Sequence, residues 1–321
     1  MKIGLDIMGG DYAPAEAIKG VQSYFEQMLP ATAGSVHLLL IGNAEIAAPY
    51  LSLIDAYHDR FTFIEAGEVI GMHEHPTRAL KEKPNSSIAI GFGLLQKGRI
   101  DAFISAGNTG AMMVGAMYTV KAVDGILRPT IATPIPRTDG KYSVLLDSGI
   151  NADCKPEHLV QFAELGALYE RHVFGVQHPR IGLLNLGEEE GKGNLLCQAT
   201  YPLLKELPGI NFIGNIEGRD VFIDKADVII CEGFVGNVLL KMAESIYDIF
   251  KVQKGFNDPF LDNFNFEIYG GTPILGINSP VIISHGIAHA LAFRNMIDVA
   301  CKVISSNLTG IIKDQFKQAV A

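Results

Sequence analysis

Small and polar residues gather in short turns that follow apolar stretches of this chain. The first turn, I-M-G-G-D, places Gly9, Gly10 and Asp11 after the apolar segment that opens the sequence. The second, S-A-G-N-T-G-A, places four small or polar residues before a helical pattern: Gly107, Asn108, Thr109 and Gly110. Glycine lets a backbone approach an anion closely, and amide groups at a helix start bind phosphate. We therefore expect both turns to bind phosphate, and the alternative for each is an ordinary turn that caps a helix.

Basic residues precede a further helical pattern. The segment H-E-H-P-T-R-A-L-K-E-K-P-N-S-S contains Arg78, Lys81 and Lys83 and ends beyond Ser86. Positive charge beside a helix N-terminus favours a phosphate group or an acidic protein, although a solvated loop explains the same pattern. The two histidines of this segment lack the further ligands that a metal site needs. Arg78, Lys83 and Ser86 are candidate phosphate ligands.

Later turns add further polar groups. They supply Asn151 in L-D-S-G-I-N, Glu188 and Asn194 in L-N-L-G-E-E-E-G-K-G-N, Gly236, Asn237 and Lys241 in E-G-F-V-G-N-V-L-L-K, and His285 in I-S-H-G. The string G-E-E-E-G-K-G is too short for an ATP-binding loop and lacks Ser or Thr after its lysine, which excludes ATP binding on this pattern. Lys241, Asn237 and His285 are candidate catalytic residues. The others named here are candidate phosphate or substrate ligands.

The elements that must position these turns alternate along the chain. Short β-like runs occupy 2–7, 36–41, 61–64, 102–105, 142–147, 180–186, 211–214 and 227–231, and helical patterns occupy 15–28, 87–96, 111–120, 156–169 and 237–251. This alternation predicts an α/β fold with crossover units and a mostly parallel sheet. Binding sites in such sheets form at the carboxyl ends of strands, so we expect the turns to meet along one sheet edge. We expect a single catalytic domain over 1–321, with a short helical excursion at about 238–266.

Composition and charge exclude several function classes. A net charge of −9 gives the chain no general attraction for nucleic acid. The 4 cysteines lie far apart without a C-x-x-C pair, so neither disulfides nor a zinc site is expected. A G-x-G-x-x-G fingerprint is absent, and we expect neither a nicotinamide nor any other cofactor, and no metal. Because no signal-peptide pattern and no apolar run of about 18 residues occurs, we expect a cytoplasmic protein.

Taken in order, these strings resemble those of the PlsX family, the acyl-acyl carrier protein:phosphate acyltransferases of bacterial phospholipid synthesis. The resemblance runs from M-G-G-D at Met8 to S-H-G at Ser284, which is nearly the whole chain. It implies a three-layer α/β/α fold similar to phosphate acetyltransferases and isocitrate dehydrogenase-like enzymes, and a homodimer. It further implies transfer of a fatty acyl group from acyl carrier protein to inorganic phosphate. The acyl-phosphate product would then pass to a membrane glycerol-phosphate acyltransferase.

The chain departs from the family pattern in three turns. It has L-D-S-G-I-N for L-D-x-G-A-N, C-E-G-F at Cys231 for C-D-G-F, and H-G-I-A at His285 for H-G-x-S. The last change removes a hydroxyl group beside His285. Relatives use a longer, more basic excursion for membrane contact, whereas 252–266 is short and carries Asp258 and Asp262. This difference argues against direct lipid binding by the excursion, and a peripheral place at the membrane stays an open alternative.

The implied reaction makes modest chemical demands. Phosphate is a competent nucleophile at neutral pH, and a thiol of pKa about 8.5 leaves readily, so neither a strong base nor a metal is required. Positioning and oxyanion donors would lower the barrier, while Lys241, Arg78 or Lys83 supplies positive charge. Because the carrier protein is acidic, a basic patch at 78–83 or at Lys251 and Lys254 must offset repulsion.

Three other functions fit parts of the pattern. A phosphate acetyltransferase or butyryltransferase acting on short acyl-CoA would use the same turns. A non-catalytic scaffold that keeps the fold is a second alternative. A metal-dependent decarboxylating dehydrogenase is the third, but the chain shows no dinucleotide fingerprint and no convincing set of metal-binding carboxylates.

Overall fold

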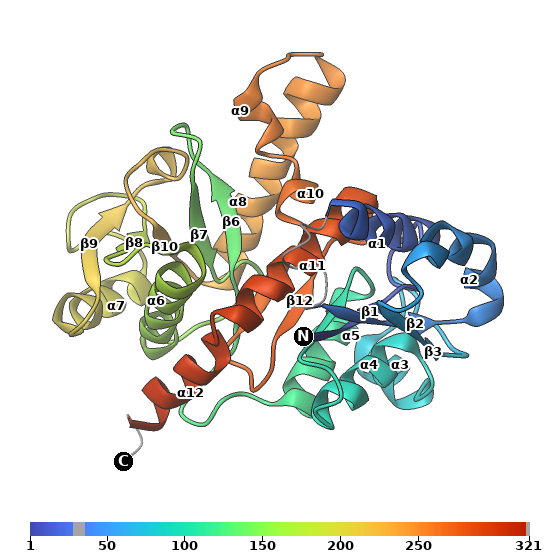
Figure 1. The fold of residues 1–321 in the computed structure, drawn as a ribbon. Helices are drawn as coiled ribbons and strands as arrows, with labels where there is room; N and C mark the ends of the chain where they lie inside the picture. The colour runs from blue at the N-terminus through green and yellow to red at the C-terminus, as the bar shows by residue number, and fades with distance from the viewer. Residues whose placement is uncertain (28–35, 319–321) are drawn as a thin grey trace. The chain divides into compact units, whose positions relative to one another are not determined.

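The computed structural model describes residues 1–27 and 36–318, and the chain divides into two compact units (Figure 1). The first unit comprises Met1–Ala122 and Glu267–Thr309. The second comprises Val123–Phe266 and the described residues from Gly310 onward. The single catalytic domain expected over 1–321 stays a prediction. Within the described residues, no helix combines the length and the apolar character needed to cross a membrane.

The first unit is built on a mostly parallel sheet. Its strands are β1 (Lys2–Asp6), β2 (His37–Gly42), β3 (Phe61–Glu65), β4 (Ala102–Ser105), β11 (Thr272–Leu275) and β12 (Val281–Ile283). They follow the order β3-β2-β1-β4-β12-β11, and all neighbours are parallel except β11 and β12. The central strands β1, β4 and β12 are buried almost throughout, as strands covered on both faces must be.

Helices cover both faces of this sheet, and Figure 1 shows α1 and α11 on one side and α4 and α5 on the other. The helices are α1 (Ala15–Gln27), α2 (Ala44–Leu51), α3 (Pro76–Glu82), α4 (Ser87–Gln96), α5 (Thr109–Gly115), α10 (Phe266–Tyr269) and α11 (Ala290–Ser305), with short segments η1 (Ser52–Tyr57) and η2 (Ala116–Val120). Ile18 and Val21 recur at helical spacing on α1 and are fully buried, and α1 contacts α11. The unit therefore has three layers.

The second unit has its own sheet, in the order β6-β7-β10-β8-β9. Its elements are β5 (Thr130–Ile131), β6 (Thr133–Pro136), β7 (Tyr142–Leu146), α6 (Pro156–Tyr169), η3 (Glu170–Phe174), β8 (Arg180–Leu184), α7 (Leu195–Glu206), β9 (Asn211–Ile216), η4 (Gly218–Asp220), β10 (Val228–Ile230), α8 (Gly233–Ile246), η5 (Tyr247–Gln253), α9 (Pro259–Asp262) and α12 (Leu308–Gln318). Strands β7, β10, β8 and β9 are parallel, and β6 is antiparallel to β7. Leu145, Ile229 and Leu239 join β7, β10 and α8 in one buried cluster.

The α/β class and the mostly parallel strands agree with the sequence-based expectation, and the bounds of β4, α4 and α6 match it to the residue. The expected end of the first helix at Met28 lies outside the described residues. Helix α8 begins at Gly233 rather than at Asn237, because Glu232 caps it four residues earlier than the glycines suggested. The expectation that all the turns meet along one sheet edge was wrong, because the strands form two sheets. Alternation of strands and helices looks the same whether the strands share one sheet or form two.

Candidate active site

In the first unit, a buried carboxylate joins the turns that follow β1 and β4. Asp6 is fully buried at the end of β1, and its Oδ2 accepts a hydrogen bond of 2.7 Å from the Ser105 hydroxyl. Its Oδ1 accepts from the Met8 amide at 3.0 Å, while the Gly107 amide donates to the Ser105 hydroxyl at 2.9 Å. Burial raises the pKa of Asp6, although the hydrogen bonds from Ser87, Ser105 and the Met8 and Gly9 amides oppose that shift. One acid therefore sets the shape of both glycine turns.

The turn after β12 lies beside the turns that follow β1 and β4. The Asp11 amide donates to the Gly286 carbonyl at 2.7 Å, directly beyond His285. A Cβ atom on Gly9 would lie 2.6 Å from the Gly107 nitrogen and 2.7 Å from Asp6 Oδ2, so only glycine fits there. The structure thus brings Gly9, Gly10 and Asp11 together with the Gly107 turn and the His285 turn at one sheet edge.

Asn108 is a helix cap that also holds a neighbouring turn. Its Oδ1 accepts from the Ala111 amide at 2.9 Å, at the start of α5. Its Nδ2 donates to the carbonyls of Gly71, Met72 and Glu74 at 3.0, 3.2 and 3.0 Å. The side chain therefore has a complete structural role. Thr109 and Gly110 form the first turn of α5, where Thr109 is exposed.

The basic residues of the 73–87 segment have carboxylate partners. Lys83 Nζ lies 2.6 Å from Glu74 Oε1 and donates to the Val69 carbonyl at 2.8 Å. This hydrogen bond from Lys83 lowers the pKa of Glu74. Arg78 pairs with Glu82 at 2.9 Å on the exposed face of α3. Ser86 caps α4. Because Lys83 and Arg78 both have carboxylate partners, the fold holds neither cation ready as an unneutralised phosphate ligand.

In the second unit, Asp147 occupies the equivalent place at the end of β7. Its Oδ1 accepts from the Thr130 hydroxyl and the Ile131 amide, each at 3.1 Å. Its Oδ2 accepts from the amides of Ile150 and Asn151 at 3.0 and 2.6 Å and from Asn151 Nδ2 at 3.1 Å. Asn151 Nδ2 also donates to the Pro129 carbonyl at 2.9 Å. Five donors thus converge on one buried carboxylate.

Helix α8 packs directly against this turn. Glu232 caps the helix by accepting from the Phe234 and Val235 amides at 2.6 and 3.0 Å. A Cβ atom on Gly236 would overlap the Asp147 carbonyl, which explains a glycine inside the helix. Asn237 is exposed in the second turn of α8 and packs against Gly149. A carboxylate of the chain itself therefore occupies the first amides of α8, and Asn237 lies beyond them.

Lys241 lies one helical turn after Asn237. Its Nζ pairs with Glu244 at 2.7 Å, and its side chain is about half exposed. Residues four apart share a helix face, so Asn237 and Lys241 point to the same side of α8. The two candidate catalytic residues of this unit are neighbours.

The turn after β8 completes this edge. Asn194 caps α7 through the Cys197 amide at 2.8 Å. Glu188 pairs with Lys225 at 2.6 Å, and Lys225 also contacts Asp220 at 3.0 Å. A cavity of about 390 Å³ joins the turns after β7, β8 and β10. It is lined by Ala152, Asp153, Cys154, Asn194, Leu196, Glu232 and Phe234.

Thiol chemistry is disfavoured beside this cavity. Burial, together with the nearby Asp147 carboxylate, raises the pKa of the Cys154 thiol to about 12. Burial also raises the pKa of Cys231 well above its ordinary value. A thiolate is the nucleophilic form of cysteine, so both thiols stay protonated and unreactive at neutral pH. Transfer by way of a cysteine thioester is not supported by these surroundings.

Sequence reasoning missed the residues that organise the second edge. Asp147 follows an apolar strand and stands two residues before Gly149 in the turn L-D-S-G-I-N, from which sequence reasoning selected only Asn151. Glu232 is the cap of α8. It was not predicted as a cap because the glycines that follow it made the start of the helix unrecognisable in the sequence. The pairing of Lys225 with Glu188 joins residues 37 positions apart, and no local signal announces it.

Comparison with known proteins agrees with this architecture. Residues 1–257 match the family model described as fatty acid synthesis protein. Phosphate acyltransferases of Desulforamulus reducens and Halothermothrix orenii are 40% and 41% identical to the chain, each over 99% of it and over 98% and 99% of their own lengths. A phosphotransacetylase from Streptococcus pyogenes shares the fold, with a TM-score of 0.62, 17% identity and 94% of each chain covered. The chain therefore belongs to the fatty acid synthesis protein family, the PlsX family, whose curated members are phosphate acyltransferases.

Proposed function

We propose that this protein transfers a fatty acyl group from acyl-[acyl carrier protein] to inorganic phosphate and releases acyl-phosphate for phospholipid synthesis. The observation that carries the proposal is the likeness to phosphate acyltransferases, at about 40% identity along nearly the whole chain. The glycine-rich turns at two sheet edges support it, because backbone amides in such turns suit both phosphate and a developing oxyanion.

The chemical step needs no cofactor. A phosphate oxygen attacks the thioester carbonyl carbon, a C–O bond forms, and the carbonyl electrons move onto oxygen. The tetrahedral species collapses, the C–S bond breaks, and the carrier thiolate leaves and takes up a proton from water. Preorganised donors stabilise the charge on that oxygen, and a single such donor contributes roughly 3 kcal/mol.

We assign the roles as follows. In the first unit, the candidate phosphate ligands are the amides and side chains of Gly9, Gly10, Asp11, Arg78, Lys83, Ser86, Gly107, Asn108, Thr109 and Gly110. In the second unit, they are those of Asn151, Glu188, Asn194 and Gly236. Lys241, Asn237 and His285 assist the transfer. Because Lys83 and Lys241 already have carboxylate partners, phosphate must exchange with those partners to contact either cation.

We further propose that the enzyme works as a cytoplasmic homodimer. It receives the acidic carrier protein on basic residues and supplies a membrane glycerol-phosphate acyltransferase. Lys81 lies exposed on α3 between Arg78 and Lys83, and Lys254 is exposed at the end of η5. These two positions are the candidate carrier contacts.

The decisive experiment incubates purified protein with phosphate and a long-chain acyl carrier protein and traps acyl-phosphate with hydroxylamine. We expect hydroxamate that depends on both substrates. Acetyl-CoA and butyryl-CoA serve as competing donors in parallel reactions. Faster transfer from either CoA ester would favour a short-chain phosphate acyltransferase, and no phosphate-dependent thioester loss from any donor would leave only the scaffold role.

A further inference from the structure

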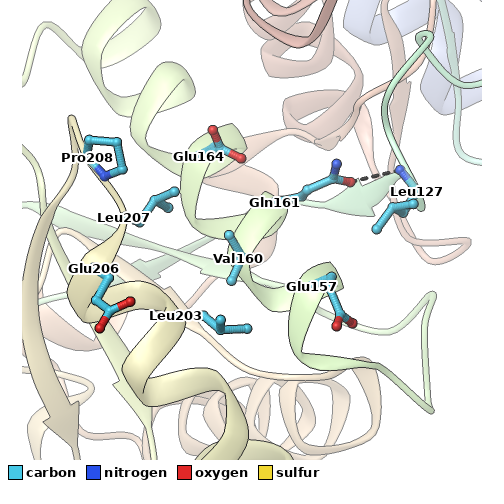
Figure 2. Close-up of a pocket in the computed structure, with 9 residues that line it drawn as sticks. All are labelled: Leu127, Glu157, Val160, Gln161, Glu164, Leu203, Glu206, Leu207 and Pro208. Carbon is cyan, nitrogen blue, oxygen red and sulfur yellow. Dashed lines mark hydrogen bonds between the residues drawn. The ribbon is translucent and has the colours of Figure 1, made fainter. Parts of the chain in front are cut away.

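A groove between α6 and α7 lies outside the candidate active site. It has a volume of about 440 Å³, and all its lining residues belong to the second unit: Leu127, Glu157, Val160, Gln161, Glu164, Leu203, Glu206, Leu207 and Pro208. The Leu127 amide donates to Gln161 Oε1 at 2.8 Å, which fixes one wall of the groove (Figure 2). None of these residues belongs to the turns assigned to acyl transfer.

The floor of the groove is apolar and open to solvent. Leu127 and Leu203 are 57% and 42% exposed. Figure 2 shows Val160 and Leu203 between Glu157 and Glu206. Exposed leucines that share a concave surface favour a partner that removes them from water.

The charged residues that line the groove all have one sign. Glu157, Glu164 and Glu206 line the groove, and no lysine or arginine is among its lining residues. Lys205, next to Glu206 in sequence, pairs with Glu190. The Glu164 carboxylate is half-buried and accepts a long hydrogen bond of 3.5 Å from Gln315. Three carboxylates without a cation among the lining residues favour a cationic occupant.

This charge pattern decides between occupants. An acidic carrier protein and an anionic membrane surface are both repelled by three carboxylates. A small cation would satisfy the charges but leave the leucines exposed. A side chain that combines an apolar stem or neighbour with a positive head uses both features at once.

We propose that this groove docks a basic amphipathic segment of a partner protein. Apolar side chains of that segment cover Val160, Leu203 and Leu207, and its lysines or arginines pair with Glu157 and Glu206. The surface is separate from the acyl transfer site, so the proposal does not depend on the proposed reaction.

The absence of tryptophan from the chain gives a clean reporter. Leu203→Trp places the only indole of the protein in the groove. The probe is an amidated peptide of sequence LLKKLLKKLLKK, and the matched probe is LLEELLEELLEE. Both peptides are also titrated into the parent chain by calorimetry, which gives their affinities without the introduced indole.

Glu157→Gln with Glu206→Gln removes two charges from the groove. Glu26→Gln with Glu45→Gln removes two charges from exposed sites of the first unit and serves as the matched control. We expect the lysine peptide to shift the indole emission and to bind about fivefold more weakly to the groove variant, in line with two partly exposed ion pairs. The control variant should bind like the natural chain, and the glutamate peptide should not bind.

Equal weakening in both double variants would overturn the proposal, because the peptide would then respond only to net charge. Spermidine that displaces the peptide with equal affinity would also overturn it, since the apolar floor would play no part. Both double variants should keep the parent rate of acyl-phosphate formation. A fall confined to the groove variant would contradict the separation of this surface from the transfer site.

Discussion

At the scale of single residues, two buried aspartates perform the same task in the two sheets. Asp6 ends β1 and gathers the Met8 amide and the Ser105 hydroxyl, while Asp147 follows β7 and gathers five donors. Hydrogen bonds to a carboxylate are stronger than those between neutral groups. Each glycine-rich turn therefore owes its shape to one acid that need not touch substrate.

Asp147→Asn should damage both stability and activity. The amide keeps the side-chain volume, but its NH₂ group replaces one of the two accepting oxygens. In one orientation it faces the donors of Ile150 and Asn151, and in the other it faces those of Thr130 and Ile131, so these donors lose their acceptor. We expect the free energy of unfolding to fall by about 2 kcal/mol, measured by urea denaturation. Asp153→Asn, an exposed acid of the same turn, is the control and should change stability little. An Asp147→Asn chain as stable as the parent would refute the organising role.

Lys241→Ala should raise the Michaelis constant for phosphate about tenfold, through loss of a charge-assisted contact. The constant for the acyl carrier protein should stay near its parent value. Glu244→Gln removes the ion-pair partner of Lys241 and keeps the ammonium group, so it should leave phosphate affinity unchanged or improve it. Full turnover and unaltered phosphate affinity in Lys241→Ala would remove this lysine from the scheme.

Residue types in the turns were visible from sequence because glycine and asparagine mark turns and caps. Their partners were not visible. Lys83 contacts Glu74 across nine positions, and that pairing depends on where α3 begins and ends. Asn108 and Asn194 were read as phosphate ligands, and the structure gives each a capping role. An asparagine before a helix supports both readings equally.

At the scale of elements, α8 shows why periodicity alone can mislead. Leu239, Met242, Ile246 and Ile249 fall on one helical face in the sequence, yet Leu239 is 8% exposed and Met242 is 55% exposed. The face that is buried carries Gly236, Leu239 and Ala243. Apolar residues of α8 itself occupy most of its circumference. The sequence pattern therefore could not select which face of the helix the sheet covers.

The segment η3 should make stability depend on pH. Burial, reinforced by Asp227, raises the pKa of Glu170 from 4.5 to about 8. Between those values the folded chain holds a proton that the unfolded chain has lost, so stability falls as pH rises, by at most about 1.4 kcal/mol per pH unit. Glu170→Gln should flatten this part of a urea-denaturation series. Glu157→Gln should not, and an unchanged slope in Glu170→Gln would place the titration elsewhere.

Helix α3 should govern affinity for the carrier protein. Lys81→Glu reverses one exposed charge, and we expect about a threefold rise in the Michaelis constant for acyl carrier protein. The constant for phosphate should not change. Lys205→Glu, an exposed reversal on α7, is the control. A selective loss of phosphate affinity would instead place α3 at the phosphate site.

At the scale of the whole molecule, fold class was predictable and the division into two units was not. Apolar runs and spacing identified most strands because buried parallel strands are apolar throughout. Strand β6 was not predicted, because its sequence, T-P-I-P, carries two prolines, which are compatible only with an edge strand. Nothing in the order of elements told that β6-β7-β10-β8-β9 form a separate sheet.

The expected homodimer can be tested through the exposed side of α8. Phe234, Val238 and Met242 are spaced four apart and are 66%, 55% and 55% exposed, so they form an apolar stripe on one helix face. A stripe of this kind favours burial against a second protein. We expect a dimer by sedimentation velocity and a monomer for Met242→Glu, because a carboxylate buried in an apolar contact lacks a partner. Ile46→Glu, at a 49% exposed position on α2, should remain dimeric. If Met242→Glu sediments as a dimer too, the stripe is not the subunit contact.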